Sequence, residues 1–132
     1  MRAKETQHLH VERYGEGEKT IVFIPGLGGT TRYWANGIGP LTEDYTVVLV
    51  DLLGFGASPK PWTRYSVERH VAELHDALGS LGHVTLVGHS LGALLAVAYA
   101  ARHREQVANI VLIGMPYFGS QRAAYRYLRS GK

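Results

Sequence analysis

Residues 84–102, VTLVGHSLGALLAVAYAAR, join two apolar segments through a serine that stands between two glycines. The first segment, VTLV, is short and rich in β-branched residues, which predicts a strand buried on both faces. The second, Leu91–Arg102, predicts an apolar helix. A turn as tight as Gly88 to Gly92 strains the backbone at Ser90, and its glycines remove the clashes that side chains would cause there. The sequence therefore predicts an exposed serine hydroxyl beyond a buried strand; the alternative is that Ser90 only caps the helix.

Strands alternate with helices along the rest of the chain. Residues 8–14 predict an exposed strand, because apolar and polar residues alternate there. Continuous apolar runs predict further buried strands at residues 20–24, 46–50 and 109–113. Parallel strands buried on both faces need helices on both sides of the sheet. The predicted fold class is therefore α/β, with a mostly parallel sheet covered by helices on both faces.

Two further helices are predicted between these strands. Residues 31–41 predict a short helix that Gly37 weakens and that ends near Pro40. Ser66 is a suitable N-cap for the next helix. Its apolar face is predicted to consist of Val67, Val71, Leu74 and Leu78.

Composition excludes several classes of function. The chain has 132 residues, 45% of them hydrophobic and 19% charged, which suits one compact domain. Its net charge of +3 is spread along the chain, so no nucleic-acid partner is expected. There is no cysteine and no metal-ligand spacing among the seven histidines, so neither a metal nor an organic cofactor is expected. Residues 1–10 lack the apolar core of a signal peptide, and we expect a cytoplasmic protein without membrane contact.

Glycine-rich loops follow two of the predicted strands. In Pro25-Gly26-Leu27-Gly28-Gly29, the amide of Leu27 is our candidate for one of the N–H donors that an acyl-transfer site directs at a developing oxyanion. The amide of Leu91, at a helix N-terminus, is the other candidate. A plain turn is the alternative for the first loop.

The other loop, DLLGFGAS, covers residues 51–58. Its glycines, Gly54 and Gly56, allow tight folding, and Asp51 is a candidate acceptor that holds the loop in place. Chemistry alone does not assign this segment a function.

These three motifs, in this order and spacing, resemble the α/β-hydrolase family, in the cap-bearing branch that includes esterases, carbon–carbon bond hydrolases and haloperoxidase-like enzymes. PGLGG stands in place of the family's HG-x-x-G, DLLGFGAS matches D-x-x-G-x-G-x-S, and GHSLGA matches the nucleophile elbow. The resemblance covers residues 8–118. It implies that residues 1–114 form the N-terminal part of the hydrolase core, without its last strands, and that residues 115–132 begin a cap segment.

The resemblance also implies roles for single residues. Ser90 matches the nucleophile, and the backbone amides of Leu27 and Leu91 match the oxyanion hole. Pro25 stands where the family usually has histidine, which leaves the Leu27 amide unaffected. The implied substrate is a small ester or related carbonyl compound. A serine at the elbow argues against the dehalogenase and epoxide hydrolase subgroups, which use aspartate.

The residues needed to complete a catalytic triad are missing. After Ser90 the only acidic residue is Glu105 and the only histidine is His103, in the wrong order for this family and about 20 Å along the helix. We therefore expect the chain alone to be inactive or nearly so. The missing groups are expected from a C-terminal polypeptide of the same enzyme. A truncated gene product, or self-association through the exposed edge of strand 109–113, is the alternative.

The other histidines are not expected to act as the base. His89 is predicted to point away from the hydroxyl into the packed elbow. On or after a predicted helix, His70, His75 and His83 are expected to be solvated. Phe55 and Trp62, with Tyr117 and Phe118 in the tail, are candidates either for an apolar pocket or for the core.

Two other functions fit parts of the sequence. A dinucleotide-binding unit would use residues 20–51, but Thr31 replaces the third glycine of G-x-G-x-x-G and such a unit leaves GHSLG unexplained. A non-catalytic binding module with the same fold would explain the missing triad residues, whereas the preserved elbow serine argues against it.

Overall fold

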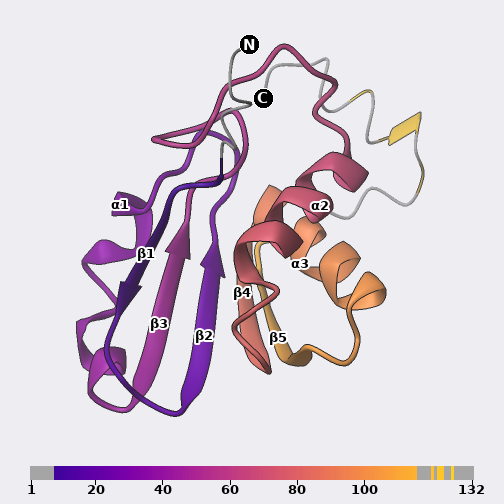
Figure 1. The fold of residues 1–132 in the computed structure, drawn as a ribbon. Helices are drawn as coiled ribbons and strands as arrows, with labels where there is room; N and C mark the ends of the chain where they lie inside the picture. Colours follow the sequence, from indigo (N-terminus) through magenta and orange to yellow (C-terminus); the bar gives the residue numbers. More distant parts are fainter. Residues whose placement is uncertain (1–7, 116–119, 121, 124–125, 127–132) are drawn as a thin grey trace, which may run out of the picture.

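The computed structural model describes residues 8–115, 120, 122–123 and 126, and its framework is a five-stranded sheet with the order β1-β3-β2-β4-β5 (Figure 1). All neighbouring strands are parallel except β1, which is antiparallel to β3. The strands are β1 (Val11–Tyr14), β2 (Lys19–Ile24), β3 (Tyr45–Val50), β4 (Val84–His89) and β5 (Val107–Ile113).

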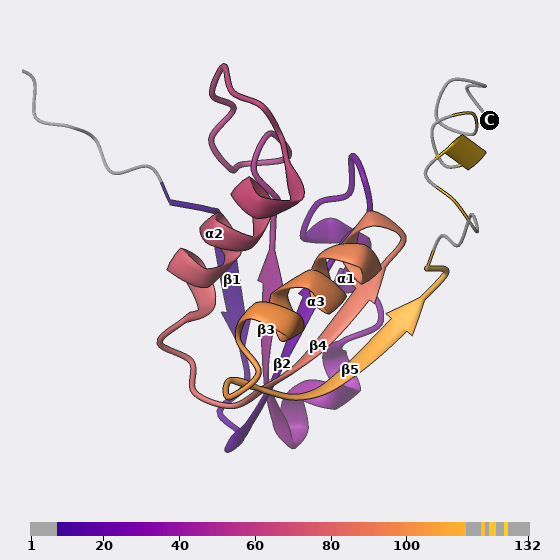
Figure 2. The same cartoon turned by 90° about the vertical axis from the view of Figure 1, so that its right-hand side faces the viewer.

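Helices cover both faces of this sheet. On one face lie α2 (Val67–Leu78) and α3 (Leu91–Arg102), and on the other lie α1 (Arg32–Ala35) and the 3₁₀ helix η1 (Gly39–Glu43) (Figures 1 and 2). The predicted fold class is therefore confirmed. No helix in the described part of the chain has the length and apolar character needed to cross a bilayer.

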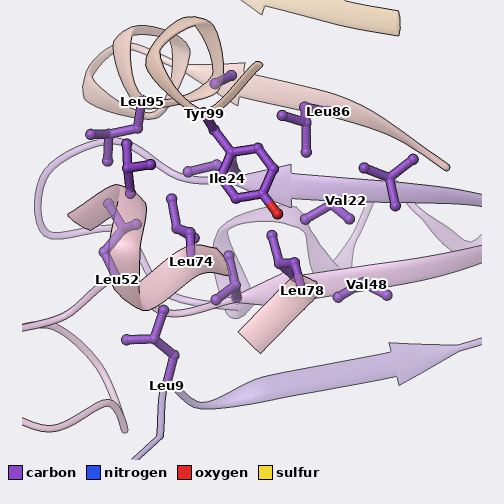
Figure 3. Close-up of a cluster of buried hydrophobic side chains, with 14 of the residues drawn as sticks. Leu9, Val22, Ile24, Val48, Leu52, Leu74, Leu78, Leu86, Leu95 and Tyr99 are labelled. Carbon is purple, nitrogen blue, oxygen red and sulfur yellow. The ribbon is translucent and has the colours of Figure 1, made fainter. Parts of the chain in front are cut away.

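The core has two layers because successive residues of a buried strand point to opposite faces. The larger layer lies between the sheet and helices α2 and α3, and Figure 3 shows its side chains. It includes Leu9, Val22, Ile24, Val48, Leu52, Leu74, Leu78, Leu86, Leu95 and Tyr99. The smaller layer consists of Phe23, Ile38, Val47, Leu49 and Val87. This packing keeps β2 and β4 adjacent in the sheet, so the loops that follow these two strands meet at the carboxyl ends of the strands.

Helix α2 begins where the sequence predicts. The Ser66 side chain accepts a hydrogen bond from the amide of Arg69 at 3.1 Å, as an N-cap does. Val71, Leu74 and Leu78 are buried. Val67, the fourth residue of the predicted apolar face, is 46% exposed. The reason is that it lies in the first turn, beside a pocket described below.

The helix predicted over residues 31–41 is interrupted. Only Arg32–Ala35 is α-helical, and a separate 3₁₀ helix follows from Gly39 to Glu43. Pro40 lies in the first turn of that second helix, where its missing amide hydrogen costs no bond. The prediction therefore failed at Gly37 and Pro40, which divide one expected helix into two short ones.

Strand β5 is exposed, although its apolar sequence predicts burial on both faces. Ile110, Val111, Leu112 and Ile113 are each 40–47% exposed. The strand pairs with β4 through one edge, and among the described residues no strand pairs with its other edge. Most of the predicted cap segment, residues 115–132, lies outside the described residues.

Candidate active site

Ser90 has a strained backbone at the junction of β4 and α3. Its φ of 55° and ψ of −116° make it the one residue other than glycine with a positive φ in the described part of the chain. Its amide donates a hydrogen bond to the carbonyl of Ile113 at 3.0 Å, and its own carbonyl accepts one from the amide of Ala93 at 3.0 Å. The strand and the helix thus hold this conformation from both sides.

Glycines around Ser90 allow the backbones to approach closely. A Cβ atom on Gly88 would lie 2.3 Å from the carbonyl oxygen of Gly92, and one on Gly92 would lie 2.1 Å from that of Ile24. A Cβ on Gly26 would lie 3.2 Å from the Cβ of Ser90. The loop after β2 therefore packs directly against the serine, as the order of the motifs predicts.

The Ser90 side chain is half-buried and makes no capping hydrogen bond with α3, although Ser90 occupies the N-cap position. The alternative that this serine serves only as a helix cap therefore finds no support in the structure. A strained serine that does not cap its helix is the arrangement that a nucleophile elbow requires.

The loop after β2 places Leu27 beside this turn. The amide of Gly29 bonds to the carbonyl of Gly26 at 3.0 Å, Gly28 has a φ of 77°, and the Leu27 side chain is 73% exposed. Leu27 and Leu91, the two residues whose amides are the oxyanion-hole candidates, line one pocket of about 390 Å³.

Asp51 joins the loops that follow β2 and β3. Its side chain is buried; one oxygen accepts a hydrogen bond from the amide of Thr31 at 2.8 Å, and the other accepts one from Ala57 at 2.9 Å. Gly56 has a φ of 55°, and a Cβ there would lie 2.3 Å from a carboxylate oxygen of Asp51. Gly54, with a φ of 91°, packs against the ring of Tyr65. Asp51 thus acts as a structural acceptor that fixes both loops near Ser90.

His89 makes a side-chain hydrogen bond that no sequence pattern indicates. Its Nδ1 atom is hydrogen-bonded to the hydroxyl of Tyr33, and the two ring centroids lie 5.4 Å apart. Tyr33 comes from α1, which packs on the opposite face of the sheet from α3. This contact ties the elbow to α1 and occupies one nitrogen of His89.

His70 is buried, which contradicts the prediction that it is solvated. It is 5% exposed and faces the core side of α2, together with Val71 and Leu74. Burial lowers its pKa, and the charge of Arg69 lowers it further. Position 70 lies four residues before Leu74, so helical spacing places it on the buried face, and this spacing is the sequence signal for its burial.

His75 and His83 are both exposed, as predicted. The ring of His75 also stacks on that of His103, with ring centroids 3.8 Å apart and an interplanar angle of 2°. Because His103 follows the C-terminus of α3 and Ser90 precedes its N-terminus, His103 lies at the far end of that helix.

Of the aromatic residues considered for an apolar pocket, Phe55 lines the pocket with Leu27 and Leu91. Trp62 does not: it is fully exposed. Tyr117 and Phe118 lie outside the described residues. Within the described ranges, no group of three or more His, Asp or Glu side chains is placed to hold a metal ion.

Comparisons with known proteins agree with this geometry. The family model for the alpha/beta hydrolase fold matches residues 19–130. The chain is 34% identical over 111 residues to "Probable lysophospholipase BODYGUARD 4" of Arabidopsis thaliana, covering 80% of the chain and 27% of that protein. It is 33% identical over 115 residues to the 2-hydroxy-6-oxo-6-(2'-aminophenyl)hexa-2,4-dienoic acid hydrolase of Metapseudomonas resinovorans, covering 83% of the chain and 39% of that protein.

A solved structure shows the same architecture. The bromoperoxidase of Bacillus anthracis superposes with a TM-score of 0.79 at 31% identity, covering 87% of the chain and 44% of that protein. The chain thus spans less than half the length of each of these proteins. The match of the family model to most of the sequence, together with the elbow geometry, shows that the chain belongs to the α/β-hydrolase fold family.

Proposed function

We propose that Ser90 is the nucleophile of a serine hydrolase that acts on an ester or a related carbonyl compound. The observation that carries this proposal is the strained backbone of Ser90 against the glycine loop at Gly26. A residue with a side chain adopts such a conformation at a cost, and strain of this kind is concentrated at functional sites. The relatives named as hydrolases support the same reaction class.

The reaction would proceed by acyl transfer. The Ser90 oxygen attacks the carbonyl carbon while its proton passes to a general base. The amides of Leu27 and Leu91 stabilise the negative charge that develops on the carbonyl oxygen. The bond to the leaving alcohol then breaks, and the alcohol takes the proton. Water, deprotonated by the same base, releases the acid and restores the serine.

The base and its carboxylate partner would come from a C-terminal polypeptide of the same enzyme. Neither His103 nor Glu105 can serve, since both follow the C-terminal end of α3, whose N-terminal end adjoins Ser90. The exposed strand β5 is the edge beside which such a polypeptide would pair. Self-association through this edge is the alternative partner.

A non-catalytic binding module with this fold is the second candidate. The observation that favours it is the position of His103 and Glu105, which leaves Ser90 without either as a partner. In that case the pocket beside Leu27 and Leu91 would bind a small molecule without turning it over.

Labelling with a fluorophosphonate distinguishes the two. The chain and its Ser90→Ala variant would each be treated alone and together with the C-terminal polypeptide, and the labelled residue mapped by mass spectrometry. The hydrolase proposal predicts labelling of Ser90 in the mixture, little or none in the chain alone, and none in the variant. Absence of label in every sample would support the binding module instead.

A further inference from the structure

The side chain of His89 is next to the elbow, because His89 is the last residue of β4 and directly precedes Ser90. Alternate residues of a strand point to the same face of the sheet. The His89 ring therefore lies on the face of Val87, which packs in the smaller core layer with Trp34 of α1. This is the face opposite α3, and the acyl transfer proposed above gives the imidazole no part.

Opposite edges of the His89 ring lie against two glycine turns. A Cβ atom on Gly26, in the turn after β2, would lie 3.5 Å from Nδ1 of His89 and 3.2 Å from the Cβ of Ser90. A Cβ on Gly114, directly after β5, would lie 3.6 Å from both Nε2 and Cδ2 of His89. Since β4 lies between β2 and β5 in the sheet, the ring fills the space between the turns on either side of the elbow. Its position therefore affects the spacing between Ser90 and the loop that carries Leu27.

The hydroxyl of Tyr33 holds this ring. It is hydrogen-bonded to Nδ1 of His89, and the two ring centroids lie 5.4 Å apart. Tyr33 packs edge-on against Trp34, with ring centroids 5.0 Å apart and an interplanar angle of 81°. Trp34 in turn packs on Phe23 of β2, with ring centroids 4.9 Å apart. A row of aromatic rings thus connects β2 to the end of β4 and places the hydroxyl beside His89.

The chemistry of the two partners sets the direction of this hydrogen bond. A phenol hydroxyl is the better donor and an unprotonated imidazole nitrogen the better acceptor, so Tyr33 donates and Nδ1 of His89 accepts. In a neutral ring the proton then lies on Nε2, on the side of Gly114. Because Tyr33 is 50% exposed, water can replace this bond, and its loss costs the fold little stability. The main effect of the bond is therefore on the orientation of the imidazole.

We propose that Tyr33 and His89 are positioning residues for the Ser90 site. Tyr33 fixes the tautomer and the orientation of the His89 ring, and the fixed ring sets the separation between Ser90 and the Leu27 amide across Gly26. Neither residue acts on the substrate itself. The assignment rests on the function proposed for Ser90, but the orientation of the ring can be measured without any reaction, so the two proposals can fail separately.

Tyr33→Phe removes only the hydroxyl and tests the proposal. The rate at which a fluorophosphonate labels Ser90 is measured at several probe concentrations, in the chain together with the C-terminal polypeptide. We expect the maximal rate to fall about three- to tenfold. The affinity for the probe should not change, since Tyr33 lies outside the pocket beside Leu27 and Leu91, and the melting temperature should equal that of the parent. Tyr45→Phe is the matched control, because Tyr45 begins β3 at the opposite end of the parallel strands, and it should change none of these values.

Substitutions of His89 separate positioning from packing. His89→Asn keeps an acceptor near the position of Nδ1 and should retain most of the labelling rate. His89→Leu fills a similar space without an acceptor and should lose as much as Tyr33→Phe. Combining His89→Leu with Tyr33→Phe should cause no further loss, since both substitutions remove the same bond. Additive losses in the double variant would show that the two side chains act independently and would contradict the proposal.

Nuclear magnetic resonance of the chain alone measures the His89 ring directly. Its nitrogen shifts should show a protonated Nε2 and an unprotonated Nδ1 in the parent. In Tyr33→Phe we expect a mixture of tautomers, together with shifts of the Ser90 and Leu27 amides. A proton on Nδ1 in the parent, or the same tautomer and amide shifts in the variant, would overturn the proposal, and the measurement on the parent needs no substitution to fold.

The outcomes for the two proposals differ. Equal labelling rates in the parent and in Tyr33→Phe would defeat the positioning role alone. Absence of label on Ser90 in every sample would defeat the hydrolase function, whereas the tautomer and the amide shifts would still decide whether Tyr33 fixes the His89 ring beside the elbow.

Discussion

Gly92 lies so close to β2 that a methyl group does not fit beside it, since a Cβ there would be 2.1 Å from the carbonyl oxygen of Ile24. We expect Gly92→Ala to lower the free energy of unfolding by about 1–3 kcal/mol, because the helix must move away from the strand. Urea unfolding measures the change. Gly39→Ala is the control, since nothing lies within 4 Å of a Cβ at that position. Equal stability of the two variants would show that the close approach is absent.

Asp51 offers a second test at the scale of single residues. Its carboxylate accepts hydrogen bonds from the amides of Thr31 and Ala57 with different oxygens. In Asp51→Asn, the NH₂ group faces one of these donors, so we expect a loss of about 1–3 kcal/mol in unfolding free energy. Thermal and urea unfolding provide the measurement. Asp44→Asn, at an exposed position, should change little, and a comparable loss there would contradict the argument.

Some site residues were predictable from the sequence and others were not. Ser90 and its flanking glycines could be found because a tight strand-to-helix turn imposes its own local chemistry. Asp51 was recognised as an acceptor, but its donors could not be named because they come from two different loops. The bond of Tyr33 to His89 depends on how α1 packs, and no local pattern records it. The burial of His70 contradicts the predicted solvated position, because its place on the apolar face of α2 outweighs its polar character.

Helices α2 and α3 meet at the stacked rings of His75 and His103. Burial, followed by the charges of His75 and Arg102, lowers the pKa of His103 from its ordinary value of 6.5. The unfolded chain therefore binds a proton at this position more readily than the folded chain. The contribution of neutral His103 to the free energy of unfolding is therefore complete above pH 6.5. It is lost as the pH falls from there through the pKa of His103 in the folded state.

This linkage predicts how a substitution at position 103 changes acid sensitivity. We expect the melting temperature of the parent to fall between about pH 7.5 and about pH 5.5, and His103→Gln to show a smaller fall because it cannot titrate. His83→Gln, at an exposed position, should follow the parent. His70, whose pKa is also lowered, adds the same contribution to all three proteins and does not affect the comparison. If the melting temperatures of the parent and of His103→Gln fall equally between these pH values, the predicted loss of stability on protonation of His103 is contradicted.

Elements were predictable to different degrees for physical reasons. The strands and α2 follow strong local patterns, namely β-branched runs and an apolar face behind a serine cap. The segment at residues 31–41 has apolar residues at helical spacing, which favours one helix, whereas Gly37 and Pro40 favour a break. The sequence pattern alone does not say which of these two tendencies prevails. Burial of β5 could not be read from its sequence at all, because it depends on what covers the strand.

At the scale of the whole molecule, the sheet has two unlike edges. The β1 edge carries charged residues such as Glu12 and Arg13, whereas the β5 edge presents a continuous apolar stretch. Charges on an edge strand discourage pairing with other chains, and apolar exposed edges favour it. The molecule is therefore expected to associate through β5.

A lysine on β5 tests this expectation. We expect Val111→Lys to reduce concentration-dependent association of the chain, and to weaken capture of the C-terminal polypeptide, because a charge would be buried in either interface. Light scattering after size-exclusion chromatography measures the first, and co-purification measures the second. Val11→Lys places the same charge on the opposite edge strand and should change neither. If only Val11→Lys reduces association, the chain associates through β1 and not through β5, and the expectation is contradicted.

The hydrogen bond from the Ser90 amide to the carbonyl of Ile113 connects that outer strand to the elbow. Ile113 is the last residue of β5, and the ends of edge strands open more readily than a core does. When the end of β5 opens, Ser90 loses one of the three backbone hydrogen bonds that hold its main chain. A second chain that pairs with β5 would therefore also restrict the orientation of the Ser90 hydroxyl. Association through this strand and the positioning of Ser90 for reaction would then be coupled.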